Sequence, residues 1–395
     1  MNVKLNNNFD LLSKKYLFDE ISTRVAAYKK SAPSAHVISL GIGDVTLPLP
    51  ATVAKEMSQA AKELGTKEGF RGYGDTLGLP ELRRAISKRY IERNVHLEAD
   101  EIFISDGAKS DLCAVPDLFG DNPSLIPSPV YPVYVDSNII AGKKIRLLEA
   151  EPSTGFLPLP PKDSTASLLY LCSPNNPTGS VFDDRLLSRW VEYARNTGSV
   201  IVFDAAYEAY IRDPALPHSI FEIDGARECS IEICSFSKMA GFTGVRCGWC
   251  AIARENPLHS LWRRRQTTKF NGASYISQRG ALAALSVEGG RECERNIDYY
   301  MNNAKLITGF AESIGLRYYG GEHAPYVWIK CPDNMYSWDA FENILYSVGV
   351  VTTPGVGFGK NGEGFLRLSA FAPREDIIEA MDRFKNSDFL HHFKF

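Results

Sequence analysis

The chain has 395 residues, of which 44% are hydrophobic and 23% charged, a composition typical of a globular protein with a large core and more than one domain. The formal net charge of −3 disfavours a nucleic-acid partner, and the short basic run over 262–269 is interpreted as a solvated helix face. All apolar runs are shorter than the roughly eighteen residues of a membrane span, and no signal-peptide pattern is found. We therefore expect a cytoplasmic protein with no nucleic-acid partner and no membrane partner.

The N-terminal arm, residues 1–34, carries the amphipathic segment Tyr16–Lys30 and is expected to pack near the C-terminal part of the chain. The next part, residues 35–286, alternates apolar runs with helical patterns, and the helix expected over Asp183–Gly198 has acidic residues at its start and glycine at its end. Its expected strands are Glu101–Ser105, Ser124–Ser128, Ser167–Ser173, Ser199–Asp204, Ser230–Ser235 and Gly244–Ala253. This alternation predicts an α/β fold whose large domain holds a mostly parallel sheet, covered by helices on both faces.

The pattern changes after about residue 286, where Gly289–Gly315 is predicted to form one long helix. Two more helices are expected over Ser337–Gly349 and Arg374–Phe384, and strands are expected within 316–331, around 350–355 and within 364–371. These elements predict a smaller α+β domain over residues 287–395.

Two short motifs are interpreted as structural. The glycines of G-x-G-x-x-G over 357–362 precede a strand-like segment, whereas a dinucleotide site needs a helix there, so we expect turns. Cys247 and Cys250 form a single C-x-x-C in an apolar run, without a second pair or nearby histidines. They are expected to be packed core thiols, and no metal site is predicted.

A stronger pattern places polar residues after successive predicted strands, where open α/β sheets bind ligands. These residues are Gly107 with Ala108, Tyr131, Asn176, Asp204 with Tyr207, and Ser235, Ser237, Lys238 and Arg246. Backbone N–H groups at a helix start, serine hydroxyls and a guanidinium suit a phosphate. An aromatic side chain can stack on a planar ring, and a lysine can condense with an aldehyde. Together with a carboxylate for a ring nitrogen, they indicate pyridoxal 5′-phosphate as the cofactor.

The motifs also carry a family resemblance that covers nearly the whole chain. Asn176-Pro-Thr-Gly, Asp204-Ala-Ala-Tyr207, Ser235-Phe-Ser-Lys238 and Arg246 resemble the class I/II aminotransferases of fold type I, which depend on pyridoxal phosphate and have a seven-stranded type of sheet. Within that family, "EGFRGYGDTLGLPELR", "SFSKMAGFTGVRCGW" and "GGEHAPYVWIK" resemble the LL-diaminopimelate aminotransferases. Two departures are His323, where the family often has asparagine, and a segment around 253–265 that is shorter than in plant-like members.

The resemblance implies a role for each candidate site residue. The catalytic residues are Lys238, Asp204 and Tyr207. The cofactor-binding residues are Tyr73, Ala108, Lys109, Tyr131, Asn176, Asp204, Tyr207, Ser235, Ser237, Lys238, Arg246 and Asn271. The substrate-binding residues are Tyr16, Gly43, Glu68, Lys109, Tyr131, Asn176, Asn271 and Arg367, of which Arg367 is the expected clamp for the substrate α-carboxylate.

The resemblance also implies a homodimer with shared active sites, in which Tyr73, Asn271 and Glu68 reach the neighbouring site. Its expected substrates are small amino acids and 2-oxo acids, namely LL-2,6-diaminopimelate with 2-oxoglutarate, converted into tetrahydrodipicolinate and glutamate. An aminotransferase of the same fold acting on lysine, aromatic or other amino acids is one alternative. A pyridoxal-phosphate-dependent C–S lyase or decarboxylase and a catalytically silent regulatory protein are two more, and the presence of Lys238, Asp204 and Arg367 argues against the last.

Overall fold

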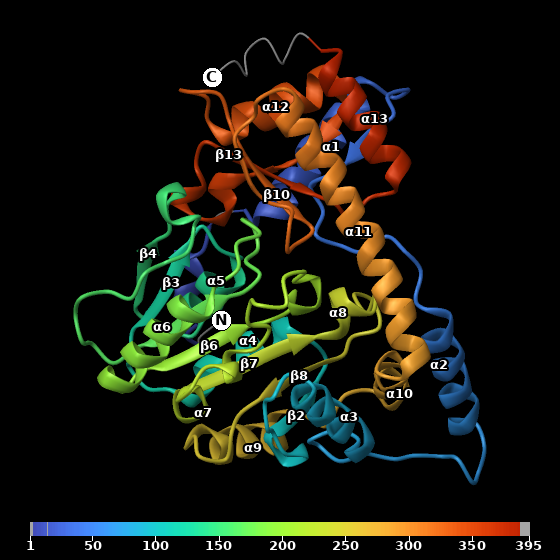
Figure 1. Ribbon diagram of the computed structural model, residues 1–395, viewed down its shortest axis with the longest axis vertical. Helices are drawn as coiled ribbons and strands as arrows, with labels where there is room; N and C mark the ends of the chain where they lie inside the picture. The colour runs from blue at the N-terminus through green and yellow to red at the C-terminus, as the bar shows by residue number, and fades with distance from the viewer. Residues whose placement is uncertain (1–2, 14, 388–395) are drawn as a thin grey trace.

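The computed structural model describes residues 3–13 and 15–387 (Figure 1), and its largest sheet has seven strands in the order β2-β8-β7-β6-β5-β3-β4. The strands are β2 (Ile102–Ser105), β3 (Ser124–Ser128), β4 (Ile145–Glu149), β5 (Leu168–Cys172), β6 (Val200–Asp204), β7 (Ser230–Ser235) and β8 (Gly248–Ala251). β8 runs antiparallel to both of its neighbours, and the pairs from β7 through β4 are parallel. The prediction of an α/β fold with a mostly parallel sheet is therefore confirmed.

All six predicted strands are present, and five of them match closely because each is a short apolar run buried on both faces. The sixth was predicted from residue 244, but β8 begins only at Gly248, since Arg246 has a φ of 66° and breaks the extended backbone. Sequence reasoning also missed β4, an edge strand with three exposed or half-exposed residues before Leu148. Cys247 and Cys250 are free and fully buried, as expected of core thiols.

Helices surround this sheet (Figure 1). They are α2 (Ala51–Leu64), α3 (Pro80–Ile91), α4 (Ala108–Ala114), α5 (Val133–Ile140), α6 (Asp184–Thr197), α7 (Ala226–Cys229), α8 (Phe236–Met239), α9 (Leu258–Lys269) and α10 (Tyr275–Ala284). Helix α2 lies against α10 and against α11 (Val287–Ser313) at the outer edge of the sheet. Short 3₁₀ turns are η1 (Asn7–Leu11), η2 (Ala99–Glu101), η3 (Val115–Leu118), η4 (Pro152–Thr154), η5 (Glu208–Tyr210) and η6 (Ile220–Glu222). Helix α6 begins and ends as predicted, because the Asp183 side chain accepts from the Leu186 N–H and Gly198 adopts a left-handed φ of 67°.

A second, antiparallel sheet has four strands in the order β12-β13-β10-β9. Its strands and the nearby helices and turns are β9 (Tyr318–Gly320), β10 (Tyr326–Lys330), β12 (Thr353–Pro354), β13 (Phe365–Ser369), α11 (Val287–Ser313), α12 (Ser337–Val348), α13 (Arg374–Lys385), η7 (Gly355–Phe358) and η8 (Lys360–Gly362). The glycine motif over 357–362 thus lies in turns, as predicted. Helix α11 packs against α2 and α10 as well as against α13 and β10, so it spans both sheets.

The N-terminal arm contacts elements of the C-terminal part of the chain. Helix α1 (Leu17–Ser31) contacts α12, where Arg24 forms an ion pair with Glu342. The strand β1 (Ile38–Ser39) pairs in parallel with β11 (Val350–Val351). The domain limits at residues 34/35 and 286/287 stay predictions.

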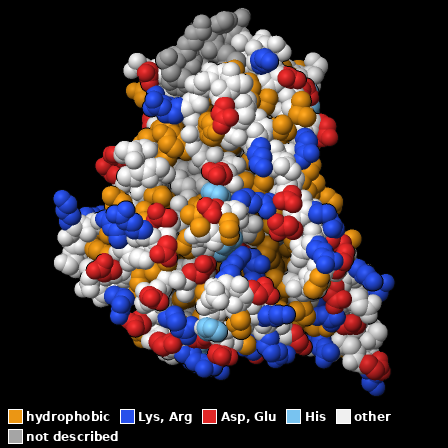
Figure 2. Space-filling view, viewed as in Figure 1, with side chains coloured by type: hydrophobic (Ala, Val, Ile, Leu, Met, Phe, Trp, Pro, Cys, Tyr) orange, Lys and Arg blue, Asp and Glu red, His pale blue; other side chains and the backbone are white. Residues whose placement is uncertain are grey.

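The surface carries both signs of charge. Figure 2 shows lysine and arginine side chains interspersed with aspartate and glutamate over the face that it presents. The basic run over 262–269 lies on α9, where Arg265 and Lys269 both pair with Asp117. Within residues 3–13 and 15–387, no helix is long and apolar enough to cross a bilayer.

Candidate active site

One cavity of about 670 Å³ lies at the carboxyl ends of the central strands. It brings together most of the residues predicted for the site, namely Gly43, Ala108, Lys109, Tyr131, Asn176, Asp204, Tyr207, Ser235, Ser237, Lys238, Arg246 and Arg367. Asn176, Asp204 and Ser235 lie at or just after the ends of β5, β6 and β7, and the parallel order of these strands places them side by side. Arg367 comes from β13 of the second sheet.

Lys238 lies on the short helix α8, whose N-cap is Ser235. Its ammonium donates to the carbonyl oxygen of Gly43, and its own carbonyl accepts from the Tyr210 hydroxyl at 3.0 Å. Burial, together with the positive charges of Arg367 and Arg246, lowers the pKa of Lys238 to about 8, although Asp44 opposes the shift. A substantial fraction of this amine is therefore neutral near pH 8 and able to act as a nucleophile or a base.

Asp204 ends β6 and is buried in the cavity wall. One carboxylate oxygen accepts from the Tyr134 hydroxyl at 2.6 Å, and the other accepts from the Ala206 N–H at 2.9 Å. Burial raises the pKa of Asp204, while these two donors oppose the shift. Because both donors are neutral, a cationic ring nitrogen would be a favourable partner for this carboxylate.

Two phenols face the same part of the cavity. The hydroxyl of Tyr207 lies 2.5 Å from that of Tyr326, and burial raises the pKa of Tyr207 well above its ordinary value. Tyr131 also lines the cavity and meets Tyr134 edge-on, with ring centroids 6.3 Å apart. These phenols offer hydroxyl donors and an aromatic face to a planar ring.

A group of anion-binding atoms lies where β2 and β7 end. Ser235 Oγ accepts from the Ser237 N–H at 3.0 Å, and the Arg246 guanidinium donates to Ser237 Oγ at 3.3 Å. Gly107 precedes Ala108 and has a φ of 133°. A Cβ at residue 107 would come within 2.4 Å of Arg246 Nη2. The close approach of backbone and guanidinium therefore needs a glycine and leaves a polar pocket that suits a phosphate.

Arg367 is 1% exposed and lies between the rings of Tyr326 and Phe358. Its Nη1 donates to Asn176 Oδ1 at 2.6 Å and its Nη2 to the Gly41 carbonyl at 2.7 Å, whereas its buried Nε has no hydrogen-bond partner among the described residues. Burial lowers the pKa of this guanidinium. A buried cation whose hydrogen bonds go to neutral oxygens can bind an incoming carboxylate strongly.

Four predicted residues do not line this cavity. Tyr16 lies in the adjacent groove, where burial and the Tyr131 hydroxyl raise its pKa, and Lys109 lies over its ring. Glu68, Tyr73 and Asn271 are exposed, and Tyr73 is 91% exposed. Their predicted contact with a neighbouring subunit stays a prediction.

Sequence reasoning missed the residues that hold the predicted ones in place. Tyr134 bonds to Asp204, Tyr326 bonds to Tyr207, and the Thr353 hydroxyl donates to the Gly41 carbonyl at 2.7 Å. Tyr134 lies in the first turn of α5, three residues after Tyr131, which precedes that helix, and this short spacing could have identified it. His323, the family departure, accepts from the backbone N–H of Arg212.

Comparisons with known proteins agree with this geometry. Residues 35–384 match the family model described as aminotransferase class I and II. The chain is 48% identical to the LL-diaminopimelate aminotransferase of Prochlorococcus marinus, over 96% of this chain and 99% of that protein. It is 45% identical to the protein of the same name from Bacteroides fragilis, over 97% of this chain and 99% of that one.

Solved structures give the same result. The L,L-diaminopimelate aminotransferase from Chlamydomonas reinhardtii superposes with a TM-score of 0.92 at 43% identity, covering 98% of each chain. An aromatic aminotransferase from Pyrococcus horikoshii superposes with a TM-score of 0.81 at 26% identity, covering 91% of this chain and 97% of that one. From its sequence match, its fold and the residues gathered in its cavity, this chain belongs to the class I and II aminotransferase family.

Proposed function

We propose that this aminotransferase uses pyridoxal 5′-phosphate to transfer the amino group of LL-2,6-diaminopimelate to 2-oxoglutarate. The products are glutamate and an amino-oxo acid that closes, with loss of water, to tetrahydrodipicolinate, a precursor of lysine and peptidoglycan. The observation that carries the reaction class is that Lys238, Asp204 and Arg367 share one cavity. The choice of substrate is supported by relatives of that name at 45–48% identity.

The residues in the cavity fit the cofactor that this family uses. Asp204 would hold its ring nitrogen, Tyr207 and Asn176 its phenolic oxygen, and Tyr131 its ring face. Its phosphate would be held by Ala108, Lys109, Ser235, Ser237 and Arg246, and its aldehyde would bind Lys238. When bound, the cofactor supplies an electron sink for the bonds at the substrate α-carbon.

The chain's own residues then orient the substrate and move its proton. Arg367 binds the α-carboxylate through its planar fork and so fixes the α-carbon near Lys238. With a pKa of about 8, the Lys238 amine can take a proton from that carbon and return it. Asp204 and Arg367 are themselves buried in the cavity wall, which strengthens their electrostatic interactions with bound groups.

A homodimer would complete this site. The phenol of Tyr73 is 91% exposed, Phe70 beside it is 68% exposed, and Glu68 and Asn271 are also exposed. An aromatic side chain left in solvent near other apolar surface favours burial in an interface. We assign Tyr73, Asn271 and Glu68 to the active site of the second subunit.

The distal end of LL-diaminopimelate carries an ammonium and a carboxylate, whereas glutamate carries a distal carboxylate alone. Lys109 in the cavity lining and Tyr16 in the adjacent groove, with its ring next to the Lys109 ammonium, would bind the carboxylate that both substrates share. Gly43 passes close to the Tyr326 hydroxyl, and a Cβ there would come within 2.7 Å of it, so this part of the cavity wall needs a residue without a side chain. Glu68 would accept from the ammonium that only diaminopimelate has.

The test is a panel of amino donors assayed against 2-oxoglutarate, with glutamate as the measured product. LL-diaminopimelate should exceed lysine and phenylalanine in kcat/KM by about a hundredfold, since an unmatched buried charge or hydrogen-bonding group discriminates strongly. A preference for phenylalanine or lysine would reject this substrate while leaving the reaction class intact. Absence of any amino transfer would reject both.

A further inference from the structure

The turn η5 directs three neighbouring side chains to three different places. Tyr207, which precedes it, points to the cavity and meets Tyr326. Tyr210 at its end is fully buried and donates to the backbone carbonyl of Lys238 at 3.0 Å. Glu208, at its start, is directed away from the cavity toward α3. This short turn therefore places Tyr207 at the cavity and Tyr210 against the Lys238 backbone. The Glu208 carboxylate contacts neither of them, so its role has to be sought among its own partners.

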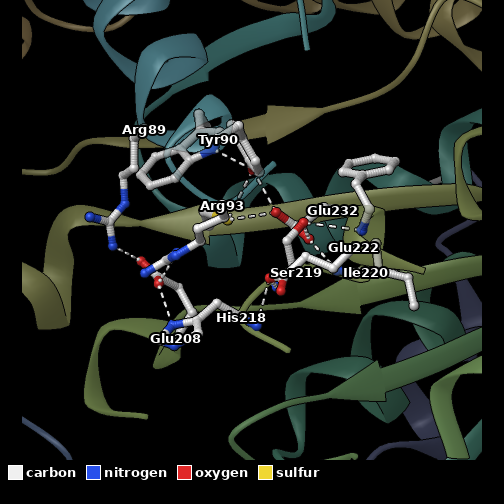
Figure 3. A network of polar contacts seen from close by, with 12 residues as sticks. Arg89, Tyr90, Arg93, Glu208, His218, Ser219, Ile220, Glu222 and Glu232 are labelled. Carbon is white, nitrogen blue, oxygen red and sulfur yellow. Dashed lines mark hydrogen bonds and ion pairs between the residues drawn. The ribbon is translucent and has the colours of Figure 1, made fainter. Parts of the chain in front are cut away.

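Glu208 is buried and held by three basic groups (Figure 3). Its carboxylate accepts from Arg89 Nη2 at 2.5 Å and from Arg93 Nη1 at 2.8 Å, and His218 Nδ1 lies 3.4 Å from it. Burial acts against ionisation here, yet Arg89 and Arg93 hold the pKa of Glu208 well below its ordinary value. A buried carboxylate with two arginines is fixed in direction and in distance.

Helix α3 also contacts the next strand, β7, through Tyr90. Tyr90 donates to Glu232 Oε1 at 2.5 Å, and the other oxygen of Glu232 accepts from Ser219 Oγ at 2.6 Å and from the Ile220 N–H at 2.8 Å. Figure 3 shows the groups around Glu208 and Glu232 side by side beneath α3. Glu232 lies on β7, which ends at Ser235, the N-cap of the helix that carries Lys238.

Strands β6 and β7, which precede Tyr207 and Lys238, are thus both bonded to α3 and the residues just after it. Strand β6 leads to Tyr207 and is anchored through Glu208, and β7 leads to Lys238 and is anchored through Glu232. The Tyr210–Lys238 hydrogen bond joins the two anchored ends directly.

We propose that Glu208, held by Arg89 and Arg93, is a positioning residue that fixes Tyr207 and the backbone of Lys238 in the geometry needed for amino transfer. The proposal rests on the proposed function only for its kinetic consequence. Its structural part concerns the protein alone. Small displacements at a reacting centre lower rates strongly even when binding persists. Loss of the anchor should therefore lower kcat far more than it changes KM.

The matched control is Glu101, which is as buried as Glu208 and also pairs with an arginine, Arg227, at 2.8 Å. Its carboxylate accepts from the backbone N–H groups of Glu98 and Arg254, just before β2 and just after β8, and Glu101 does not line the cavity. Glu208→Gln and Glu101→Gln each remove one buried charge and keep the side-chain volume. They differ in that Glu208 belongs to the turn whose Tyr210 bonds the Lys238 backbone, whereas Glu101 has no such connection to Lys238.

The experiment compares wild type, Glu208→Gln and Glu101→Gln in two measurements. The first is hydrogen exchange of the cofactor-free protein over residues 205–211 and 236–240. The second is kcat and KM for glutamate with excess 2-oxoglutarate, together with the pH midpoint of the absorbance change of bound pyridoxal phosphate. We expect Glu208→Gln to speed exchange in both segments about tenfold, to lower kcat at least tenfold with KM within threefold, and to shift the midpoint. Glu101→Gln should leave the exchange rates, kcat, KM and the midpoint close to wild type.

Unchanged exchange in residues 205–211 and 236–240, or a fall in kcat no larger than that of Glu101→Gln, would overturn the proposal. Should Glu208→Gln fail to fold, Arg93→Gln replaces it, since Arg89 still pairs with Glu208 in that variant. Arg93→Lys should then restore most of the lost kcat. A lack of restoration would also count against positioning by charge. A wild-type protein without transaminase activity would reject the proposed function, whereas the exchange result would still decide on the anchor.

Discussion

The Nη1 atom of Arg367 lies 2.6 Å from the Oδ1 atom of Asn176, so the side chain that is proposed to hold the substrate bonds directly to one that is proposed to hold the cofactor. Arg367 comes from β13 of the antiparallel sheet, and Asn176 follows β5 of the large sheet. This hydrogen bond joins the two sheets at the cavity. Changes at either residue should therefore affect substrate use in the same way.

Replacement of the guanidinium tests this relationship. Arg367→Lys keeps the charge but loses the fork that reaches Asn176 and the Gly41 carbonyl together. Since a lysine ammonium cannot bind a carboxylate through two parallel hydrogen bonds, kcat/KM for every amino donor should fall by about a hundredfold, about 2.7 kcal/mol. Arg212→Lys is the matched control, because Arg212 pairs with Glu294 and Asp298 at the surface. Equal effects of the two changes would refute the role of Arg367.

The low pKa of Lys238 predicts how cofactor attachment depends on pH. Burial lowers this pKa from 10.5 to about 8, so the neutral, reactive amine becomes the main form above pH 8 and declines as the pH falls below it. The rate at which cofactor-free protein attaches pyridoxal phosphate should rise to a plateau with a midpoint near pH 8, measured by borohydride trapping and peptide mass. Lys238→Ala should show no label at this position and no amino transfer. A midpoint near the ordinary lysine value would contradict the environment described for this amine.

Asp204 is expected to matter for rate more than for folding. Asp204→Asn keeps the size and removes the negative charge; its Oδ1 can still accept from the Ala206 N–H, and its Nδ2 can donate to the Tyr134 hydroxyl, which reverses that bond. If that charge stabilises a protonated ring nitrogen, its loss costs on the order of 3 kcal/mol, about a hundredfold in kcat. The melting temperature and cofactor content should change little. A variant within twofold of wild type would leave Asp204 with only a structural role.

Glu68→Gln should affect the use of LL-diaminopimelate and of glutamate to different extents. We expect kcat/KM for LL-diaminopimelate to fall by about thirtyfold or more, because one partner of a desolvated charge pair is lost, whereas kcat/KM for glutamate should change less than twofold. Glu192→Gln, on the exposed side of α6, controls for loss of a surface charge. Equal losses for both donors would reject Glu68 as the partner of the distal ammonium.

Hybrid dimers test whether subunits share residues. Lys238→Ala and Tyr73→Ala homodimers should each be strongly impaired, since each lacks one group in both sites. In a hybrid, the Tyr73→Ala chain keeps Lys238 and receives the partner's Tyr73, so one of two sites is complete. Refolding an equal mixture should thus give about a quarter of wild-type activity if the dimer is symmetric. Activity no higher than the mean of the two variants would argue that Tyr73 does not act across an interface.

The sequence predicts best those elements whose structure is determined by a local pattern, such as a continuous apolar run or a pair of helix-capping residues. Buried runs such as Ser230–Ser235 admit only a central strand, and Asp183 with Gly198 marks both ends of a helix. Strand β4 was missed because its exposure pattern depends on its place at the sheet edge, which no local pattern records. Tyr134 and Tyr326 were missed because a phenol in an apolar run resembles a core residue until its partner across the fold is known.

The pairing of β1 with β11 has a consequence for how the chain matures. The Thr353 hydroxyl and the Gly41 carbonyl that it bonds are separated by 312 residues, and Gly41 in turn accepts from Arg367. A ribosome releases Gly41 early, but the segment around it cannot take its final position until Val351, Thr353 and Arg367 have emerged. The wall that contacts Lys238 through Gly43 is therefore assembled last. Nascent chains in which the large sheet has already folded would still have an open, unfinished cavity, and a cofactor captured at that stage would meet only half of its final surroundings.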